Sequence, residues 1–514
     1  MLYTKKSKNI YLVLIIFFVV NLFFLVNFPF IHSDESWLAG LSRTIINEGT
    51  FDITEPFYDI YPRTPHAIKI IFHSIQIIVL KVFGYKIFSF RLISLLFGTL
   101  SIYFIYKIAA IFTKSEKLAL ACSILLAVDI QFIYASHFAR QEIILLAIFL
   151  SAFYYFLKRV IEKNKYYNDF FLGMIIFLSI GIHPNSFIIF LPFVFIYLYY
   201  IFIEKKIMFS NLLIFILTVS IGALIFIFLS LFFDPNFFSN YSNYGGNLGV
   251  LSSLSVKVDR LDYFYKKLFY QVSGTYFTPA LKIQFLLFGF LTILSLLKAV
   301  FKKDNYNNIL LLSILAVNLA FVLIGRYNQT SIIFIFPLFY LLLINSLKIF
   351  NKKYSTLIIA FLIIIISISS IIIVFNNSYF NYDDYLDQIS LSVKSNETVL
   401  ANLNTHFYFD YKKLYDYRNL AYLKQNKLNF SQYIIKNDIE YIIYPEEMDY
   451  IYNSRPQWNT LYGNLYPFYR EMKDFIQNDC KLIHQFSNKS YGMRIVKYMN
   501  EKDWQIKIYK VIND

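Results

Sequence analysis

Acidic and basic side chains stand at the ends of long apolar blocks in this sequence. Asp34 and Glu35 follow the first block, and Arg140 and Glu142 occupy a short turn between two later blocks. A carboxylate in such a place can act as a general base toward a hydroxyl group. Arginines bind phosphate oxygens bidentately and stabilise the charge on a leaving phosphate. These residues favour chemistry on an anionic lipid headgroup. Further arginines of this kind are Arg63, Arg91 and Arg326.

The acidic pair also has a purely structural interpretation. HSDESWLAGLSRTIINEG is typical of a short helix opened by Ser33 or Asp34, with acidic residues in its first turn. Capping and catalysis are equally compatible with Asp34. We expect ordinary hydrogen-bonded histidines at four positions near these blocks, and no HxxxH or HExxH pairing accompanies them. With only two cysteines in the chain, no metal site is predicted. The four histidines are His66, His73, His137 and His183.

The elements that must position these residues are apolar helices. The chain has 514 residues, of which 57% are hydrophobic and only 16% charged, with a mean hydropathy of +0.51. A soluble domain is about a quarter charged, so a soluble globular enzyme is excluded. The net charge of +15 is explained by lysine-rich cytoplasmic loops rather than by nucleic-acid binding. We predict an all-α polytopic membrane protein.

Eleven apolar blocks are interpreted as spans, each of which takes about 20 residues to cross a bilayer. Two of them, 143–157 and 169–182, are short and are expected to be extended or kinked. The N-terminal block follows three lysines but has no small-x-small cleavage site, so we take it as a span rather than as a signal peptide. The predicted spans are 10–30, 87–113, 118–136, 143–157, 169–182, 185–203, 211–233, 282–300, 308–324, 331–349 and 355–375.

The segment 65–83 decides the orientation. It is apolar but carries Lys69, His73, Gln76 and Lys81. If it lies in the outer interface as an amphipathic helix, six clusters of Lys and Arg fall on one side of the membrane, as the positive-inside rule requires. We therefore predict a cytoplasmic N-terminus and an extracytoplasmic C-terminal region in the plasma membrane of a bacterium. The unusual polar residues then gather at the outer face, which favours a polar cavity over isolated ion pairs.

Two domains are predicted. Residues 1–375 form the transmembrane module, with outer loops at 31–86 and 234–281. Residues 376–514 form a small α/β domain, in which ETVLANL, IEYIIYP, MRIVKYM and WQIKIYKVI are typical of strands and FSQYIIKN of a helix. The loop 234–281 contains Gly245 and Gly246 as a candidate hinge, and either a lid or a passive interfacial helix fits it.

The order of these motifs resembles a known family. HSDESWLAGLSRTIINEG is followed by YPRTPH, by VFGYKIFSFRLISLLFGTL and by ASHFARQEIILLAIFL, while GRYNQTSIIFIFPLFYLL comes late in the chain. The set is similar to the GT-C superfamily of membrane glycosyltransferases, of the protein O-mannosyltransferase and lipid A aminoarabinose transferase type. The resemblance is clearest over residues 30–160.

The resemblance implies an inverting transfer of one sugar from a polyprenyl-phosphate donor to a lipid or protein acceptor. Asp34 would be the base, and Glu35 would hold the acceptor or orient the loop. The turn reads RQE where some GT-C enzymes have a metal-binding DxE, which favours a reaction without a metal or other cofactor. Arg63 precedes Thr-Pro rather than Pro, and Arg91 would support the phosphate or pair with a carboxylate. The implied donor-binding residues are Arg63, Arg91, Arg140, Glu142 and Arg326.

Other functions compete with this one. A transporter or flippase of lipid-linked sugars would need a similar basic cavity, although no internal repeat supports it. An envelope glycan polymerase or ligase, and an inactive scaffold, are further alternatives. The sugar, the acceptor, the oligomeric state and the role of the C-terminal domain are left open by the sequence.

Overall fold

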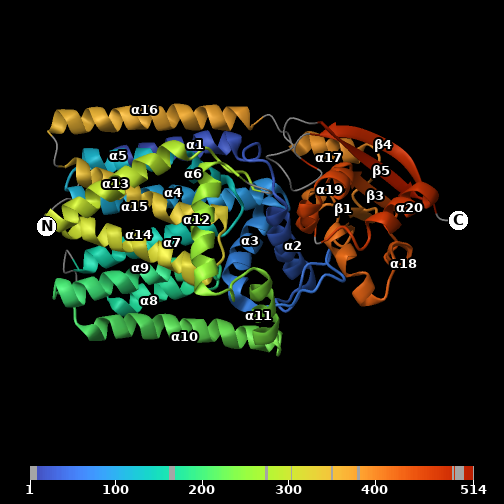
Figure 1. The fold of residues 1–514 in the computed structure, drawn as a ribbon, viewed down its shortest axis with the longest axis horizontal. Coiled ribbons are helices and arrows are strands. Elements are labelled where there is room, and N and C mark those ends of the chain that lie inside the picture. The colour runs from blue at the N-terminus through green and yellow to red at the C-terminus, as the bar shows by residue number, and fades with distance from the viewer. Residues whose placement is uncertain are drawn as a thin grey trace.

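The computed structural model describes residues 8–160, 168–272, 276–301, 304–348, 351–378, 382–462, 464–488, 491 and 503–512. A bundle of long helices forms one end of the molecule and a smaller domain with a sheet forms the other (Figure 1). This confirms the predicted fold class.

Helical structure occurs at each of the eleven predicted spans. Eight described helices are long and apolar enough to cross a membrane, and a bent pair makes a ninth. Two apolar helices are shorter, α1 and α8. The bundle elements are α1 (Lys8–Phe24), α4 (Ile87–Thr113), α5 (Glu116–Ala127), α6 (Ile130–His137), α7 (Glu142–Val160), α8 (Asp169–Leu178), α9 (Ser186–Leu198), the π-helical turn η2 (Tyr199–Ile203), α10 (Phe209–Phe233), α13 (Lys282–Phe301), α14 (Asn305–Ile324), η3 (Gln329–Ile335), α15 (Phe336–Leu347) and α16 (Lys352–Asn376).

The predicted span 118–136 is broken rather than continuous. Its two halves, α5 and α6, meet at an angle of 64°. Asp129 causes the break, because its carboxylate accepts hydrogen bonds from the backbone N–H groups of Gln131 and Phe132 and so caps a new helix. The same carboxylate is buried and accepts hydrogen bonds from Gln284 and Tyr340 on neighbouring helices.

Shorter helices lie between the bundle and the sheet domain. The segment predicted as an interfacial helix forms η1 (Ala67–Lys69) and α3 (Ile70–Phe83), and it packs against α4 and against α2 (Ser33–Glu48). Figure 1 shows α2 and α3 crossing the direction of the long helices at the end of the bundle that faces the sheet domain. The loop 234–281 contains α11 (Phe237–Asn247) and α12 (Leu254–Phe269).

The C-terminal domain has a five-stranded mixed sheet in the order β2-β1-β3-β5-β4. β1 pairs in parallel with β2 and β3, while β5 pairs antiparallel with β3 and β4. Four of the five predicted elements are present: ETVLANL contains β1, IEYIIYP contains β3, FSQYIIKN contains α18 and WQIKIYKVI contains β5. The fifth, MRIVKYM, lies outside the described residues. β2 and β4 were not predicted. The elements are α17 (Tyr382–Ser390), β1 (Val399–Ala401), η4 (Leu403–Thr405), β2 (Leu414–Asp416), η5 (Tyr417–Tyr422), η6 (Lys424–Asn426), α18 (Phe430–Lys436), β3 (Tyr441–Pro445), α19 (Glu447–Ser454), η7 (Pro456–Tyr462), α20 (Tyr469–Asp479), β4 (Cys480–Asn488) and β5 (Trp504–Val511).

The sheet domain and the first outer loop share one apolar core. Phe57 and Tyr58 of the loop belong to the same buried cluster as Val399 and Ile506 of the sheet. Hydrogen bonds fix the contact: the Asn419 side chain accepts from the backbone N–H of Tyr61 at 3.1 Å and donates to the carbonyl of Phe57 at 2.8 Å. The Tyr491 hydroxyl accepts from the backbone N–H of Ile31 at 3.2 Å. The domain therefore holds the segment that carries the acidic pair.

Candidate active site

Helix α2 begins at Ser33, and its N-cap is His32. The Nδ1 atom of His32 accepts a hydrogen bond from the backbone N–H of Asp34, and the Glu35 carboxylate accepts one from the backbone N–H of His32 at 2.9 Å. The prediction that Ser33 or Asp34 caps the helix is therefore wrong. Because His32 and Glu35 complete the cap, the carboxylate of Asp34 is available for other contacts.

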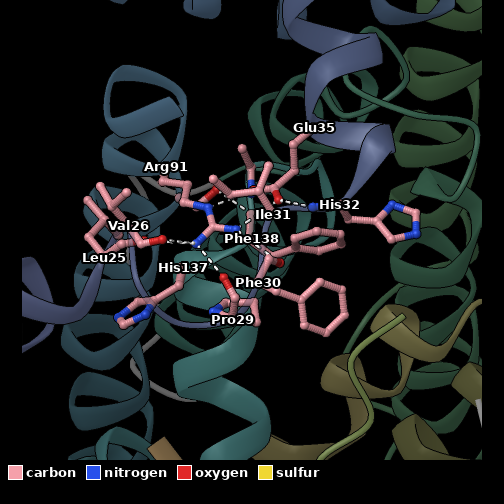
Figure 2. A network of polar contacts seen from close by, with 12 residues as sticks. Leu25, Val26, Pro29, Phe30, Ile31, His32, Glu35, Arg91, His137 and Phe138 are labelled. Carbon is pink, nitrogen blue, oxygen red and sulfur yellow. Dashed lines mark hydrogen bonds and ion pairs between the residues drawn. The ribbon is translucent and has the colours of Figure 1, made fainter. Parts of the chain in front are cut away.

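Glu35 and Arg91 form a buried ion pair. Both nitrogen–oxygen distances of the bidentate contact are 2.8 Å, and neither residue is exposed to solvent. The guanidinium also donates to the carbonyls of Leu25 and Pro29 (Figure 2). The Glu35 carboxylate accepts a further hydrogen bond from the backbone N–H of Ala139. The sequence left two roles open for Arg91, phosphate binding and pairing with a carboxylate, and the structure shows the pairing with a carboxylate. The pair joins α2, α4, the end of α1 and the turn before α7.

Asp34 has different partners, Arg140 and Tyr276. Its Oδ2 atom accepts hydrogen bonds from Arg140 Nη1 at 3.0 Å and from the Tyr276 hydroxyl at 2.5 Å. The Tyr276 ring stacks on His32 with 4.3 Å between centroids. Arg140 also contacts Glu142 at 3.2 Å. A carboxylate held between a guanidinium and a phenol is oriented by both groups and is stabilised in its charged form by the guanidinium.

A cavity of about 320 Å³ opens beside Asp34. It is bounded by α2, by the segment from Tyr61 to Lys69, by the turn before α7, by α11 and by Tyr422 of the sheet domain. Asp34 is the only residue with a carboxylate among the residues that line this cavity. Its cationic side chains are Arg63, Lys69, Arg140 and Arg326, and its histidines are His66 and His183.

The cavity is electropositive because two of its four cations have no carboxylate partner among the described residues. Arg63 lies 3.3 Å from Glu55 and stacks over the Trp37 ring. Within the described chain, no ion pair joins Lys69 or Arg326 to a carboxylate. Burial, followed by the charges of Arg63 and Arg326, lowers the pKa of Lys69 to about 7.

The histidines beside the cavity are neutral. Burial, reinforced by the charge of Lys69, lowers the pKa of His66 and of His183 well below the usual range. The other two of the four histidines considered from the sequence make ordinary hydrogen bonds. His73 pairs with Ser42, and His137 pairs with the carbonyl of Phe28 and with Asn21. Among the described residues, no group of three or more His, Cys, Asp or Glu side chains is placed to hold a metal ion.

The structure divides the predicted site residues into two groups. Four of them line the cavity, and the other three lie in the wall behind it, where Glu142 pairs with Arg140 and with Thr330. The cavity residues are Asp34, Arg63, Arg140 and Arg326, and the wall residues are Glu35, Arg91 and Glu142.

Two important residues were missed by the sequence interpretation. The sequence did indicate a role for Lys69, since a lysine within an apolar segment is unusual, but we used this lysine only to place the segment in the interface. Nothing in the sequence distinguishes Tyr276, because the chain contains 44 tyrosines. In addition, α11 lines the cavity through residues such as Tyr241 and Tyr244, so the loop 234–281 contacts the site.

Comparison with known structures shows which fold this is. The chain matches the structure of ArnT from Cupriavidus metallidurans bound to undecaprenyl phosphate with a TM-score of 0.58, covering 98% of both chains at 11% identity. The chain has the GT-C fold. The chain also matches the apo oligosaccharyltransferase of Archaeoglobus fulgidus with a TM-score of 0.56 at 15% identity, covering 89% of this chain and 72% of that one.

The sequence comparison agrees with the fold. Residues 69–231 of the chain match the model of the family described as dolichyl-phosphate-mannose-protein mannosyltransferase. No curated protein sequence matches significantly. The expected resemblance to GT-C membrane glycosyltransferases is confirmed, and the chain is a multi-pass membrane protein.

Proposed function

We propose that this protein transfers one sugar from a polyprenyl-phosphate donor to a hydroxyl group of an envelope lipid or protein, with inversion at the anomeric carbon. One observation carries the proposal: a single cavity contains the Asp34 carboxylate and four cationic side chains. The family match and the fold support a glycosyltransferase. The solved ArnT structure, which holds undecaprenyl phosphate, supports a lipid-linked donor.

In the proposed step, the acceptor oxygen attacks the anomeric carbon of the donor sugar. The new carbon–oxygen bond forms as the bond from that carbon to the phosphate oxygen breaks, and polyprenyl phosphate leaves. Asp34 accepts the acceptor's proton. Arg63, Arg326 and Lys69 bind the phosphate and stabilise its growing charge. Arg140 bridges the two groups, because it already contacts Asp34 and lines the same cavity.

The remaining predictions belong to this proposal. Glu35 and Arg91 orient the loop and do not touch the donor. The reaction needs no metal, since the turn reads Arg140-Gln141-Glu142 and its arginine occupies the place of an acidic ligand. The cavity opens on the extracytoplasmic side of the plasma membrane, together with the sheet domain.

Substitution of Asp34 by Asn tests the proposed base. The amide preserves the shape but cannot take up the proton, so we expect turnover to fall at least about a hundredfold. Envelope lipids and proteins would be compared by mass spectrometry in a deletion strain complemented with wild type or D34N at equal expression. We expect one monosaccharide mass to disappear in the mutant, and its carrier identifies the acceptor.

A matched control is Asp52→Asn, in an exposed part of the same outer loop. This variant should give the wild-type products. Purified D34N should still bind undecaprenyl phosphate, which separates loss of the base from loss of folding. Unchanged products from D34N would disprove the assignment of the base and favour a transporter of lipid-linked sugars.

A further inference from the structure

Gln141 is a buried amide that points to a ligand. It lines the cavity and is only 1% exposed. Neither its Oε1 nor its Nε2 atom has a hydrogen-bond partner among the described residues. Buried polar groups are nearly always paired, and an amide with neither atom paired at the edge of a binding cavity is suited to pair with what the cavity binds.

The backbone around Gln141 is fixed, so its side chain cannot leave the wall by a movement of the turn. The preceding residues are tied to α2 through the contacts of Ala139 with Glu35 and of Arg140 with Asp34. The carbonyl of Gln141 accepts the backbone N–H of Leu145 in the first turn of α7. Gln141 is therefore held directly next to the residue that contacts the proposed base.

The chemistry of an amide selects the ligand group. A glutamine side chain offers a carbonyl acceptor and two N–H donors. A phosphate oxygen can only accept, so it would leave the carbonyl oxygen unpaired. A hydroxyl group donates and accepts, and neighbouring hydroxyls on a ring can satisfy both ends of the amide. The phosphate already has Arg63, Lys69 and Arg326 as partners.

Other residues that line the cavity fit the same ligand. Helix α11 contributes the amides of Asn240 and Asn243 and the rings of Tyr241 and Tyr244. Aromatic side chains with a few placed polar groups are typical of pockets that hold a ligand in one orientation.

We propose that Gln141 binds hydroxyl groups of a sugar beside Asp34 and so determines specificity for that sugar. The inference rests on the proposed function. The sugar is either that of the donor or one in the acceptor, since both present the same hydroxyl chemistry.

Gln141→Leu tests the proposal, because leucine has nearly the same volume and no polar atoms. Binding to purified full-length protein would be measured with undecaprenyl phosphate and with undecaprenyl phosphates carrying mannose, glucose or galactose. For the sugar-bearing lipid that wild type binds most tightly, we expect Q141L to weaken binding at least about tenfold. Binding of sugar-free undecaprenyl phosphate should not change.

The control is Gln131→Leu, since Gln131 is another buried glutamine with an unpaired Nε2 atom but does not line the cavity. Q131L should leave both affinities unchanged, and thermal unfolding of the two variants should be compared. If Q141L instead raises only the KM for the acceptor, the hydroxyls belong to the acceptor.

Two results would overturn the inference while leaving the proposed function intact. One is an equal loss of affinity for both lipids in Q141L, which would make Gln141 a structural residue. The other is unchanged affinity for both lipids together with an unchanged acceptor KM. Failure of wild type to bind either lipid would overturn the proposed function and this inference with it.

Discussion

Lys69 is a cation of the cavity whose charge changes near neutral pH. Its pKa is lowered to about 7, first by burial and then by Arg63 and Arg326, with Glu55 opposing them. A bound phosphodiester favours the protonated lysine, so binding takes up a proton once the pH exceeds about 7. The neighbouring histidines do not add to this, because the pKa of His66, and likewise that of His183, lies well below the usual range.

We therefore expect the affinity for an undecaprenyl phosphate-linked sugar to fall by up to about tenfold from pH 7 to pH 9. Arginine stays charged throughout this range, so Lys69→Arg should bind with little dependence on pH. Lys69→Met should bind weakly at every pH. Titration calorimetry at several pH values would measure this, and an equal slope in wild type and K69R would contradict the assignment.

The sequence limited what could be predicted for single residues. The positions of Asp34 and Arg140 at the ends of spans follow from hydropathy, and both line the cavity. The division between cavity and wall depends on which way a side chain points. Asp34 and Glu35 are neighbours in sequence but have different partners, because Glu35 takes part in capping α2. The partner of Glu35 is 56 positions away, and no local pattern identifies it.

At the level of elements, the buried Glu35–Arg91 ion pair joins α2 to α4. Removing one partner of a buried ion pair costs about 3–5 kcal/mol. Arg91→Met should therefore lower the apparent Tm of the detergent-purified protein more than Arg63→Met, since Arg63 is half-buried and has a single carboxylate partner. Equal Tm values with lost donor binding in R91M would instead make Arg91 a donor ligand.

The helices themselves were largely predictable, because a span must satisfy its backbone hydrogen bonds internally and bury about 20 apolar residues. The break at Asp129 was not predicted, although a carboxylate within an apolar block was visible. Only the structure shows that this carboxylate caps α6. In the sheet domain, β2 was missed because its three residues carry little periodicity.

At the level of the whole molecule, the sheet domain forms part of the cavity wall rather than a separate module. Asn419 is fully buried and bonds to the backbone of Phe57 and Tyr61. Asn419→Ala should loosen the loop that carries Arg63 and weaken donor binding by several-fold, at about 1 kcal/mol for each lost hydrogen bond. Asn453→Ala, at an exposed position of α19 away from the cavity lining, is the control. Equal affinity in the two variants would show that the domain does not support the site.

The hydrogen bond between Ile31 and Tyr491 joins residues that are 460 positions apart. Ribosomes deliver the chain from its N-terminus, so the acidic pair is synthesised while most of the protein is still unmade. Until Tyr491 has emerged and folded, the segment before α2 lacks this anchor. We expect nascent chains stalled after α16 to be inserted in the membrane yet inactive, which delays activity until synthesis is almost finished. Activity of membranes carrying chains stalled before and after Tyr491 measures that delay.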